Sequence, residues 1–505
     1  MMRLSAPLQR AATAIVFAAT TALCSTAAMA GPWLEPGDRQ VRQDIELLKA
    51  HGLIYGPLDS WPIPWMQVSR GLETARQTAQ PPHIAAAVRR LETLARREEQ
   101  GRRVEARLRA TNEPDKLRDF EDSAREDVDV DAEVQFDTGR LTVVLGGGYR
   151  EDQDGFDGHV ENSFLAYAAG NWALYGGYVE RWWGPGQDTT LLFSTNARAF
   201  PQIGVRRLLP APIDLPVLRW LGPVSFSAFA GILTEDRETS GFNDPAIVGF
   251  RGVIEPVEGL EIGFSRGIQL CGEDRPCDGE TIIDALFPFS GVENTGTLDE
   301  PGNQLAGIDL VYRFTIGGLS TSAYTEWQAE DESGIFVLDR FVRLFGGTLS
   351  GPLGSDGSSW TANLEYTDTL TREYFNQASL LSGLPFPTVA YNNAIYTDGF
   401  TYRGDVLGAA IGGSGDLVTL RVAMTDASNR RFFLTGQRVD LNKVDRPGNI
   451  VALSENRETF NKLTAGAVIP TSFGDVSGEV RLQDDQADTP GRSDGRVAAE
   501  IGWRL

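Results

Sequence analysis

The stretch DVDVDAEVQFDTGRLTVVLGGGY, residues 127–149, decides the fold class of this chain. Its first half alternates acidic and apolar side chains, and a turn at Asp137, Thr138 and Gly139 leads into a second apolar run. A period of two places alternate side chains on opposite faces of a strand, and a short polar connection joins two antiparallel strands. The stretch therefore predicts a β-hairpin with one apolar and one polar face.

The same pattern recurs as far as the C-terminus. Examples are VSFSAFAGIL (224–233), LEIGFSRGI (260–268), WTANLEYTD (360–368) and VSGEVRLQD (476–484). Short turns alternate with longer connections rich in Pro, Gly and Asp, and this asymmetry is typical of a transmembrane β-barrel of the outer-membrane type. The sequence thus predicts a mainly β fold, an antiparallel barrel over residues 121–505.

The last strand-like run, GRVAAEIGWRL, strengthens this prediction. Ile501, Trp503 and Leu505 alternate with Gly502 and Arg504, so one face of the final strand is apolar and includes an aromatic ring. Such a face resembles the terminal strand recognised when barrels are inserted into the outer membrane, although a terminal Phe is commoner than Leu505. We therefore expect the outer-membrane insertion machinery to be a partner during biogenesis.

A soluble β-sandwich or propeller is the alternative fold. Against it stand the absence of a propeller-like repeat and the aromatic residues Trp172, Tyr175 and Tyr178, which we place at strand ends near the membrane surface. After residue 30 no segment approaches the ~20 consecutive apolar residues of a spanning helix. A closed barrel is the other way to satisfy every backbone group in lipid.

The first thirty residues are expected to be a secretory signal peptide. Arg3 and Arg10 precede an apolar stretch, residues 11–23, and residues 28–30 read Ala-Met-Ala, a site for cleavage. Lipidation at Cys24 is the alternative, but a bulky Leu precedes that cysteine where a small residue is expected. The mature chain is therefore expected in the outer membrane after export.

Residues 31–120 are predicted to form a small helical domain at the periplasmic side. Asp38 can cap a first helix that Gly52 stops, and Ser69 opens a second. A third has apolar residues at helical spacing and continues through REEQGRRVEARLRA, residues 97–110. These apolar residues are Ile84, Val88, Leu91 and Ala95. We interpret the Arg run as a solvated helix face rather than an anion-binding patch.

Cysteine, histidine and charge limit the function further. Export favours a disulfide between Cys271 and Cys277, with two unpaired loop thiols as the alternative. His51, His83 and His159 do not cluster with these cysteines, so we expect no metal site. The net charge of -23 becomes -25 without the signal peptide, which argues against a nucleic-acid partner.

Enzymatic activity finds no support in the motifs. The chain contains no G-x-S-x-G elbow, H-E-x-x-H pair or P-loop. With 69 Asp and Glu residues, a chance pair of carboxylates is no evidence for a glycosidase. We expect neither catalysis nor a cofactor.

Three stretches resemble the Wzi family of capsule-assembly proteins. They are residues 31–65, residues 175–207, which contain YGGYVERWWGPGQDTTLLFSTNARAFPQIGVRR, and residues 391–408, YNNAIYTDGFTYRGDVLG. The resemblance implies an outer-membrane barrel of about eighteen strands with a helical bundle at its periplasmic mouth. It also implies a surface lectin that binds and anchors capsular polysaccharide or exopolysaccharide.

Other functions stay open beside that of a lectin. A porin-like channel for small solutes is the main alternative, and a polysaccharide-modifying enzyme is a weaker one. The helical N-terminal domain favours the lectin, because an ordinary porin has no need of it. We expect a monomer whose partners are the polysaccharide and the lipid or lipopolysaccharide of the outer membrane.

Two clusters combine aromatic faces, which stack on sugars, with polar groups that hydrogen-bond hydroxyls. In the first cluster, Gln187 stands where the family commonly has an aromatic residue. Instead of binding sugar, the segment of the first cluster could anchor at the membrane surface, form a tight turn or plug the lumen. The second cluster could instead be an ordered loop that packs on itself. The predicted polysaccharide-binding residues are Arg181, Trp182, Trp183, Asp188, Asn196 and Arg198 in the first cluster, and Tyr391, Asn392, Tyr396, Asp398, Tyr402 and Arg403 in the second.

Overall fold

The computed structural model describes residues 32–152, 155–286, 302–330, 340–373, 384–385, 389–444, 449–454, 456–485 and 496–505. The predicted signal peptide and its cleavage site lie outside the described residues. None of the helices in these ranges is long and apolar enough to cross a membrane.

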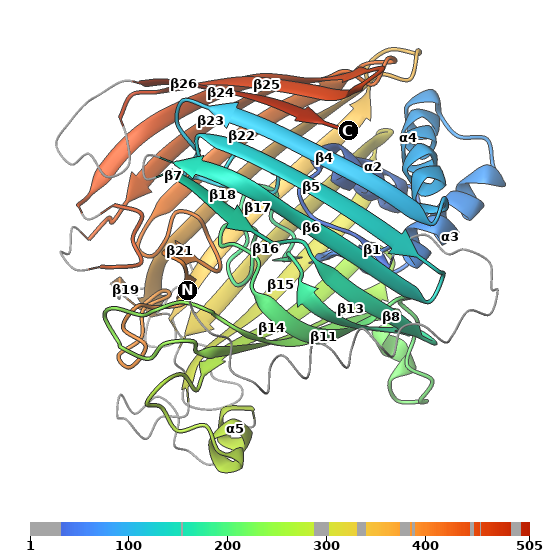
Figure 1. Cartoon of the computed structure of the whole chain (residues 1–505). Coiled ribbons are helices and arrows are strands. Elements are labelled where there is room, and N and C mark those ends of the chain that lie inside the picture. The colour runs from blue at the N-terminus through green and yellow to red at the C-terminus, as the bar shows by residue number, and fades with distance from the viewer. Residues whose placement is uncertain are drawn as a thin grey trace.

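Eighteen strands in the described part of the chain form a closed antiparallel barrel (Figure 1), which confirms the predicted fold class. The barrel closes where β26 pairs with β4, and two short strands, β7 (Gly155–His159) and β19 (Leu384–Pro385), pair antiparallel with one end of β6 and of β18. The eighteen strands are β4 (Arg102–Thr111), β5 (Val128–Asp137), β6 (Leu141–Asp152), β8 (Phe164–Ala169), β9 (Trp172–Tyr178), β11 (Pro201–Arg207), β12 (Val224–Ile232), β13 (Ala246–Val257), β14 (Leu260–Leu270), β15 (Gly302–Ile316), β16 (Leu319–Glu330), β17 (Phe341–Pro352), β18 (Ser359–Glu373), β22 (Asp416–Thr425), β23 (Arg431–Leu441), β24 (Glu458–Thr471), β25 (Gly474–Gln483) and β26 (Arg496–Arg504).

The two faces of the barrel wall differ in polarity. In β22, Leu420 and Val422 point outward and are exposed, whereas Thr419 and Arg421 point into the lumen and are buried. Large apolar side chains are exposed on the outside of most strands, and a closed barrel with an apolar exterior is suited to span a membrane. Examples are Val130, Leu145, Leu174, Ile203, Phe264, Leu310, Leu364, Leu434, Leu463, Val480 and Ile501.

Two strand-level predictions have different outcomes. The hairpin of residues 127–149 is confirmed as β5 and β6, in which Val134 pairs with Leu145. Tyr175 was expected at the membrane surface, but this prediction is wrong. Its side chain is buried in the lumen against Trp33, because alternation along β9 turns Trp172 and Leu174 outward and Tyr175 inward.

Three helices lie at one end of the barrel, which we call the helical end (Figure 1). They are α2 (Arg39–Ala50), α3 (Trp65–Arg76) and α4 (Pro82–Glu98). Asp38 caps α2 as predicted, since its side chain accepts hydrogen bonds from the backbone of Gln40 and Val41. The predicted start of the second helix at Ser69 is wrong, because α3 already begins at Trp65.

The predicted helical domain is too long at its C-terminal end. Residues 102–111 form barrel strand β4 instead of continuing the third helix. Val104 and Leu108 are exposed on the outside, and Glu105 is buried in the lumen. The alternation was hidden because charged residues occupy the inner face, where a soluble protein would place apolar ones.

The remaining elements lie in the part of the chain before the barrel, residues 32–98, which we call the N-terminal unit, and in the connections between barrel strands. Short turns connect strands at the helical end, except for the longer connection 208–223 between β11 and β12. Long connections, including residues 112–127, 179–200 and 389–415, lie at the opposite end, which we call the loop end. In outer-membrane barrels short turns are periplasmic. The further elements are β1 (Trp33–Leu34), β2 (Ser60–Trp61), β3 (Ile63–Pro64), β10 (Trp182–Trp183), β20 (Thr401–Tyr402), β21 (Asp405–Val406), α5 (Gly279–Leu286) and the 3-10 helix η1 (Arg219–Leu221).

Candidate functional site

Two of the long connections, residues 179–200 and 389–415, fold into the lumen, and we call them together the plug. Leu191, Phe193 and Phe400 of the plug belong to one buried cluster with Phe229 and Leu344 of the wall. Apolar packing of this kind in the middle of a barrel replaces the water of an open channel. The plug contains all the predicted polysaccharide-binding residues.

The turn that follows the two tryptophans is held by a carboxylate of the barrel wall. The backbone N–H groups of Gln187, Asp188 and Thr189 donate to Glu365 of β18 at 2.6, 3.2 and 2.9 Å. Beside it, the N–H of Leu191 donates to Glu326 of β16 at 2.9 Å. Buried charge-assisted hydrogen bonds are strong, so this turn is a fixed part of the wall rather than a free loop.

Trp182 and Trp183 are both buried, each with 1% of its surface exposed. Trp182 packs edge-on against Phe120 at 5.3 Å and donates from Nε1 to the carbonyl of Gly186 at 2.9 Å. Trp183 packs against Phe193 and Phe229. In this conformation neither ring can stack on a sugar. The segment plugs the lumen, as one of the alternatives to sugar binding predicted.

Charged residues of the first cluster also make internal contacts. The guanidinium of Arg181 lies 3.6 Å from the centre of the Phe229 ring and donates to Gln202. Asp188 forms a buried ion pair with Arg39 of α2 at 2.5 Å. The pairing of β10 with β2 makes a second link between the plug and the N-terminal unit.

The second cluster packs on the first. The hydroxyl groups of Tyr391, Tyr396 and Tyr402 are all bonded inside the protein. Tyr391 donates to the carbonyl of Leu191 at 2.6 Å, which joins the two plug segments directly. The loop is therefore ordered, but these three tyrosines bond to the other plug segment and to the connections after β12 and β14, so the loop does not pack only on itself.

Two polar members of the second cluster hold loops in place. Asn392 donates to the side-chain oxygen of Asn449 at 3.2 Å. Asp398 accepts from the backbone N–H groups of Thr239 and Ser240 at 3.1 and 2.8 Å. Both residues therefore have structural partners at the loop end.

The predicted disulfide between Cys271 and Cys277 is confirmed. The carbonyl of Cys271 accepts the hydroxyl of Tyr396 at 2.8 Å, and Arg275 lies over the same tyrosine ring. The bridge thus fixes a loop that packs on the plug.

Three predicted residues, Asn196, Arg198 and Arg403, line a cavity of about 760 Å³ at the loop end. Arg403 lies in the turn between β20 and β21, and both Arg403 and Gly404 have positive φ, as a two-residue hairpin of type I′ requires. Asn196 donates to the carbonyl of Val406 at 2.8 Å, so the two clusters meet at this cavity.

The connection 112–127 supplies cavity residues that the sequence did not single out. Arg118 donates to the carbonyls of Ala124 and Ser123 at 3.1 and 3.0 Å, and its Nε has no partner in the described part of the chain. Burial, reinforced by the neighbouring charge of Arg125, lowers the pKa of Arg118 to about 10. The side chain remains charged at neutral pH. Asp122 and Asp405 act on it from a longer distance, but among the described residues no carboxylate lies within ion-pairing distance of it, so the cavity presents a partly uncompensated cation.

Other charges of the cavity are partly compensated. Arg198 pairs with Glu126 at 3.0 Å, and Arg125 donates to the carbonyls of Thr195 and Asn196 at 2.8 Å. Burial raises the pKa of Asp405, and the surrounding arginines, Arg125 first, oppose that rise. No pattern in the sequence marked Arg118 or Arg125, since both lie in a run of mixed charges.

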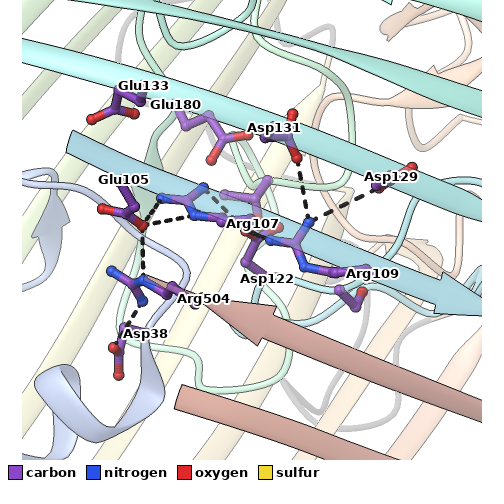
Figure 2. A network of polar contacts seen from close by, with 12 residues as sticks. Asp38, Glu105, Arg107, Arg109, Asp122, Asp129, Asp131, Glu133, Glu180 and Arg504 are labelled. Carbon is purple, nitrogen blue, oxygen red and sulfur yellow. Dashed lines mark hydrogen bonds and ion pairs between the residues drawn. The ribbon is translucent and has the colours of Figure 1, made fainter. Parts of the chain in front are cut away.

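A network of ion pairs joins the N-terminal unit and connection 112–127 to the inner wall (Figure 2). Glu105 of β4 lies 2.8 Å from both Arg107 and Arg504, and Arg504 reaches Asp38 at 3.2 Å. Asp122 forms ion pairs with both Arg107 and Arg109. Burial alone would raise the pKa of Asp122, but these two guanidinium groups lower it to about 2.

Histidine, cysteine and carboxylate groups are the side chains that most often bind metal ions in proteins. Within the described ranges no three of these side chains come together in a way that could hold a metal ion. The chemistry available at the cavity is therefore that of guanidinium, amide and carboxylate groups.

Comparison with known proteins identifies the family. The sequence profile described as "Capsule assembly protein Wzi" matches residues 96–496, which is most of the chain. A Klebsiella pneumoniae protein described as an uncharacterized 55.8 kDa protein in the cps region is 28% identical over 408 residues, covering 78% of this chain and 75% of that protein.

Among solved structures, that of Wzi of Escherichia coli shows the same architecture. Wzi of Escherichia coli, described as an outer membrane protein involved in group 1 capsule assembly and as a carbohydrate-binding β-barrel, is 22% identical with a TM-score of 0.75; the match covers 94% of this chain and 99% of that one. OccD3 of Pseudomonas aeruginosa matches with a TM-score of 0.43 and 11% identity, over 80% of this chain and 91% of that one. The barrel is of the outer-membrane type, and the chain belongs to the Wzi family of capsule assembly proteins.

Proposed function

We propose that this protein is an outer-membrane lectin that binds capsular polysaccharide or exopolysaccharide and anchors it at the cell surface. The observation that carries the proposal is the cavity at the loop end, which contains the partly uncompensated guanidinium of Arg118. Its volume of about 760 Å³ falls within the range of ~300–1,000 Å³ usual for ligand pockets. Membership of the Wzi family supports the role in capsule assembly.

The residues around the cavity suit an acidic sugar. Arg118, Arg198 and Arg403 offer planar donors that match a carboxylate, and Asn196 offers an amide for hydroxyl groups. The chain as a whole is strongly acidic, so local cations are needed to attract an anionic polymer. Of the predicted binding residues, we retain Asn196, Arg198 and Arg403 as direct contacts and assign the buried aromatic residues to the support of the site.

Binding is favoured over transport and over catalysis. The plug fills the lumen with packed apolar side chains, which does not suit a porin-like channel. The family is one of capsule assembly rather than of enzymes, and we propose that the chain holds the polymer without cleaving it. We also propose that it acts as a monomer surrounded by outer-membrane lipid and lipopolysaccharide, after delivery by the insertion machinery.

Polymer retention by cells tests the proposal. Cells producing the double variant Arg118→Gln, Arg403→Gln should make normal total amounts of polysaccharide but shed more of it than wild-type cells. Arg457→Gln is the matched control, because Arg457 is an exposed arginine at the loop end that does not line the cavity. Equal retention by both variants, each folded and present in normal amounts, would remove the cavity from the binding site.

A further inference from the structure

The connection between β11 and β12 differs from the other turns of the helical end. Residues 208–223, LLPAPIDLPVLRWLGP, form a loop of sixteen residues, which we call the rim loop. The other strand connections at this end have two to six residues in the described part of the chain. Long connections of this kind are uncommon and are usually functional, so the rim loop is a candidate for a separate role.

The rim loop exposes large apolar side chains. Leu215, Val217 and Trp220 are 55%, 76% and 66% exposed. The exposed charges of the loop, Asp214 and Arg219, form an ion pair with each other. A contiguous exposed apolar surface marks a site that contacts another apolar phase.

This apolar surface continues the lipid-facing side of the barrel. The 3-10 helix η1 in the rim loop contacts β13, and Gly222, with a φ of +67°, lies so close to the wall that a Cβ atom there would be 1.9 Å from the carbonyl oxygen of Glu255. Next to the start of the loop, Trp172 packs edge-on against Phe226 on the outer wall at 6.1 Å between ring centres. Figure 1 shows the rim loop projecting beside the barrel wall, near β11 and β13.

The backbone of the rim loop is suited to an apolar environment. The amides of Leu215, Leu218 and Arg219 donate within the loop at 2.8 to 3.1 Å, and those of Leu221 and Gly222 do so at 3.1 and 3.2 Å. The four prolines of the loop have no amide to satisfy. Internal hydrogen bonding lowers the cost of moving backbone groups out of water.

We propose that the rim loop is an interfacial anchor that inserts into the periplasmic leaflet of the membrane. Leu215 and Val217 enter the boundary of the acyl chains, and Trp220 lies at the level of the headgroups, where tryptophan is enriched. The Asp214–Arg219 pair stays in the headgroup layer. This inference is independent of polysaccharide binding, because the rim loop lies at the end opposite the cavity.

A fluorescent probe on the loop tests the proposal. Val217→Cys is labelled with an NBD fluorophore in the full mature chain and reconstituted into phosphatidylcholine and phosphatidylglycerol vesicles; Cys271 and Cys277 are bridged and do not react. Ser428→Cys is the control, because Ser428 is exposed in a polar turn at the same end of the barrel. We expect a blue-shifted emission at position 217 that is lost when the acyl chains are brominated, and neither effect at position 428.

The same experiment can overturn the proposal. If the probe at position 217 emits like the probe at 428 and brominated lipid does not quench it, the rim loop is in water and the anchor is wrong. Protection that arises only when periplasmic proteins are added would also refute a lipid contact and would assign the surface to a protein partner. Leu215→Cys repeats the measurement at a second exposed position, so that one poorly folded variant does not decide the outcome.

Discussion

Replacing Glu365 by Ala is expected to release the plug turn from the barrel wall. The carboxylate accepts three backbone amides, those of Gln187, Asp188 and Thr189. Each buried donor left without an acceptor costs about 1–3 kcal/mol, so the three together lower the free energy of local opening by at least about 3 kcal/mol. Such a change accelerates amide exchange roughly 100-fold when exchange proceeds through local opening.

Hydrogen exchange followed by mass spectrometry measures this effect directly. Peptides containing residues 184–191 should exchange faster in Glu365→Ala, while peptides from distant strands keep wild-type rates. Glu365→Gln should be intermediate, because its amide oxygen still accepts hydrogen bonds but carries no charge. Glu479→Ala is the matched control, since Glu479 lies on the inner face of β25, away from the turn.

One result would refute this reasoning. If Glu365→Ala folds, as judged by its migration on an unboiled gel, and the amides of residues 187–189 exchange at wild-type rates, the carboxylate does not hold the turn. If the Ala variant does not fold, the Gln variant decides the question in the same way, because it preserves the shape of the side chain.

Three further predictions concern stability. Burial and the charge of Glu133 raise the pKa of Glu35, which lies between β1 and α2, to about 8. The stabilisation from protonated Glu35 is therefore complete below about pH 4.5 and is lost as the pH rises towards 8, so melting temperatures at pH 5 and 8.5 should differ less in Glu35→Gln than in wild type. For Asp122, whose pKa the arginines lower to about 2, the stabilisation is present above the unfolded value of about 3.9 and is lost between about pH 4 and 2, so Asp122→Asn should flatten acid unfolding curves. Trp182→Ala removes a buried ring and should destabilise the plug by about 3–5 kcal/mol, seen as a lower melting temperature; unchanged melting together with lost glycan binding would restore the stacking role.

Strand periodicity predicted the barrel because lipid imposes a uniform apolar exterior. The hairpin of residues 127–149 shows this pattern in its sequence, and the structure confirms it as β5 and β6. Strand β4 was missed because Glu105, Arg107 and Arg109 on its inner face pair with charges of the lumen. Because the sequence does not show these partners, the charged residues of β4 resemble the solvent-exposed face of a helix.

The candidate site was harder to predict, because a sugar site and a packed plug use the same residue types. Trp182, Trp183 and Tyr391 have the aromatic faces and polar tips that suit a glycan, and the plug uses the same groups to fill the lumen and to bond backbone carbonyls. The two roles differ in whether a wall residue such as Glu365 accepts hydrogen bonds from the backbone amides beside the aromatic residues. The bond between the Gln187 amide and Glu365 joins positions 178 residues apart. A contact between such distant positions cannot be predicted from the spacing of residues in the sequence. The folded structure is therefore needed to distinguish the residues that support the cavity from those that line it.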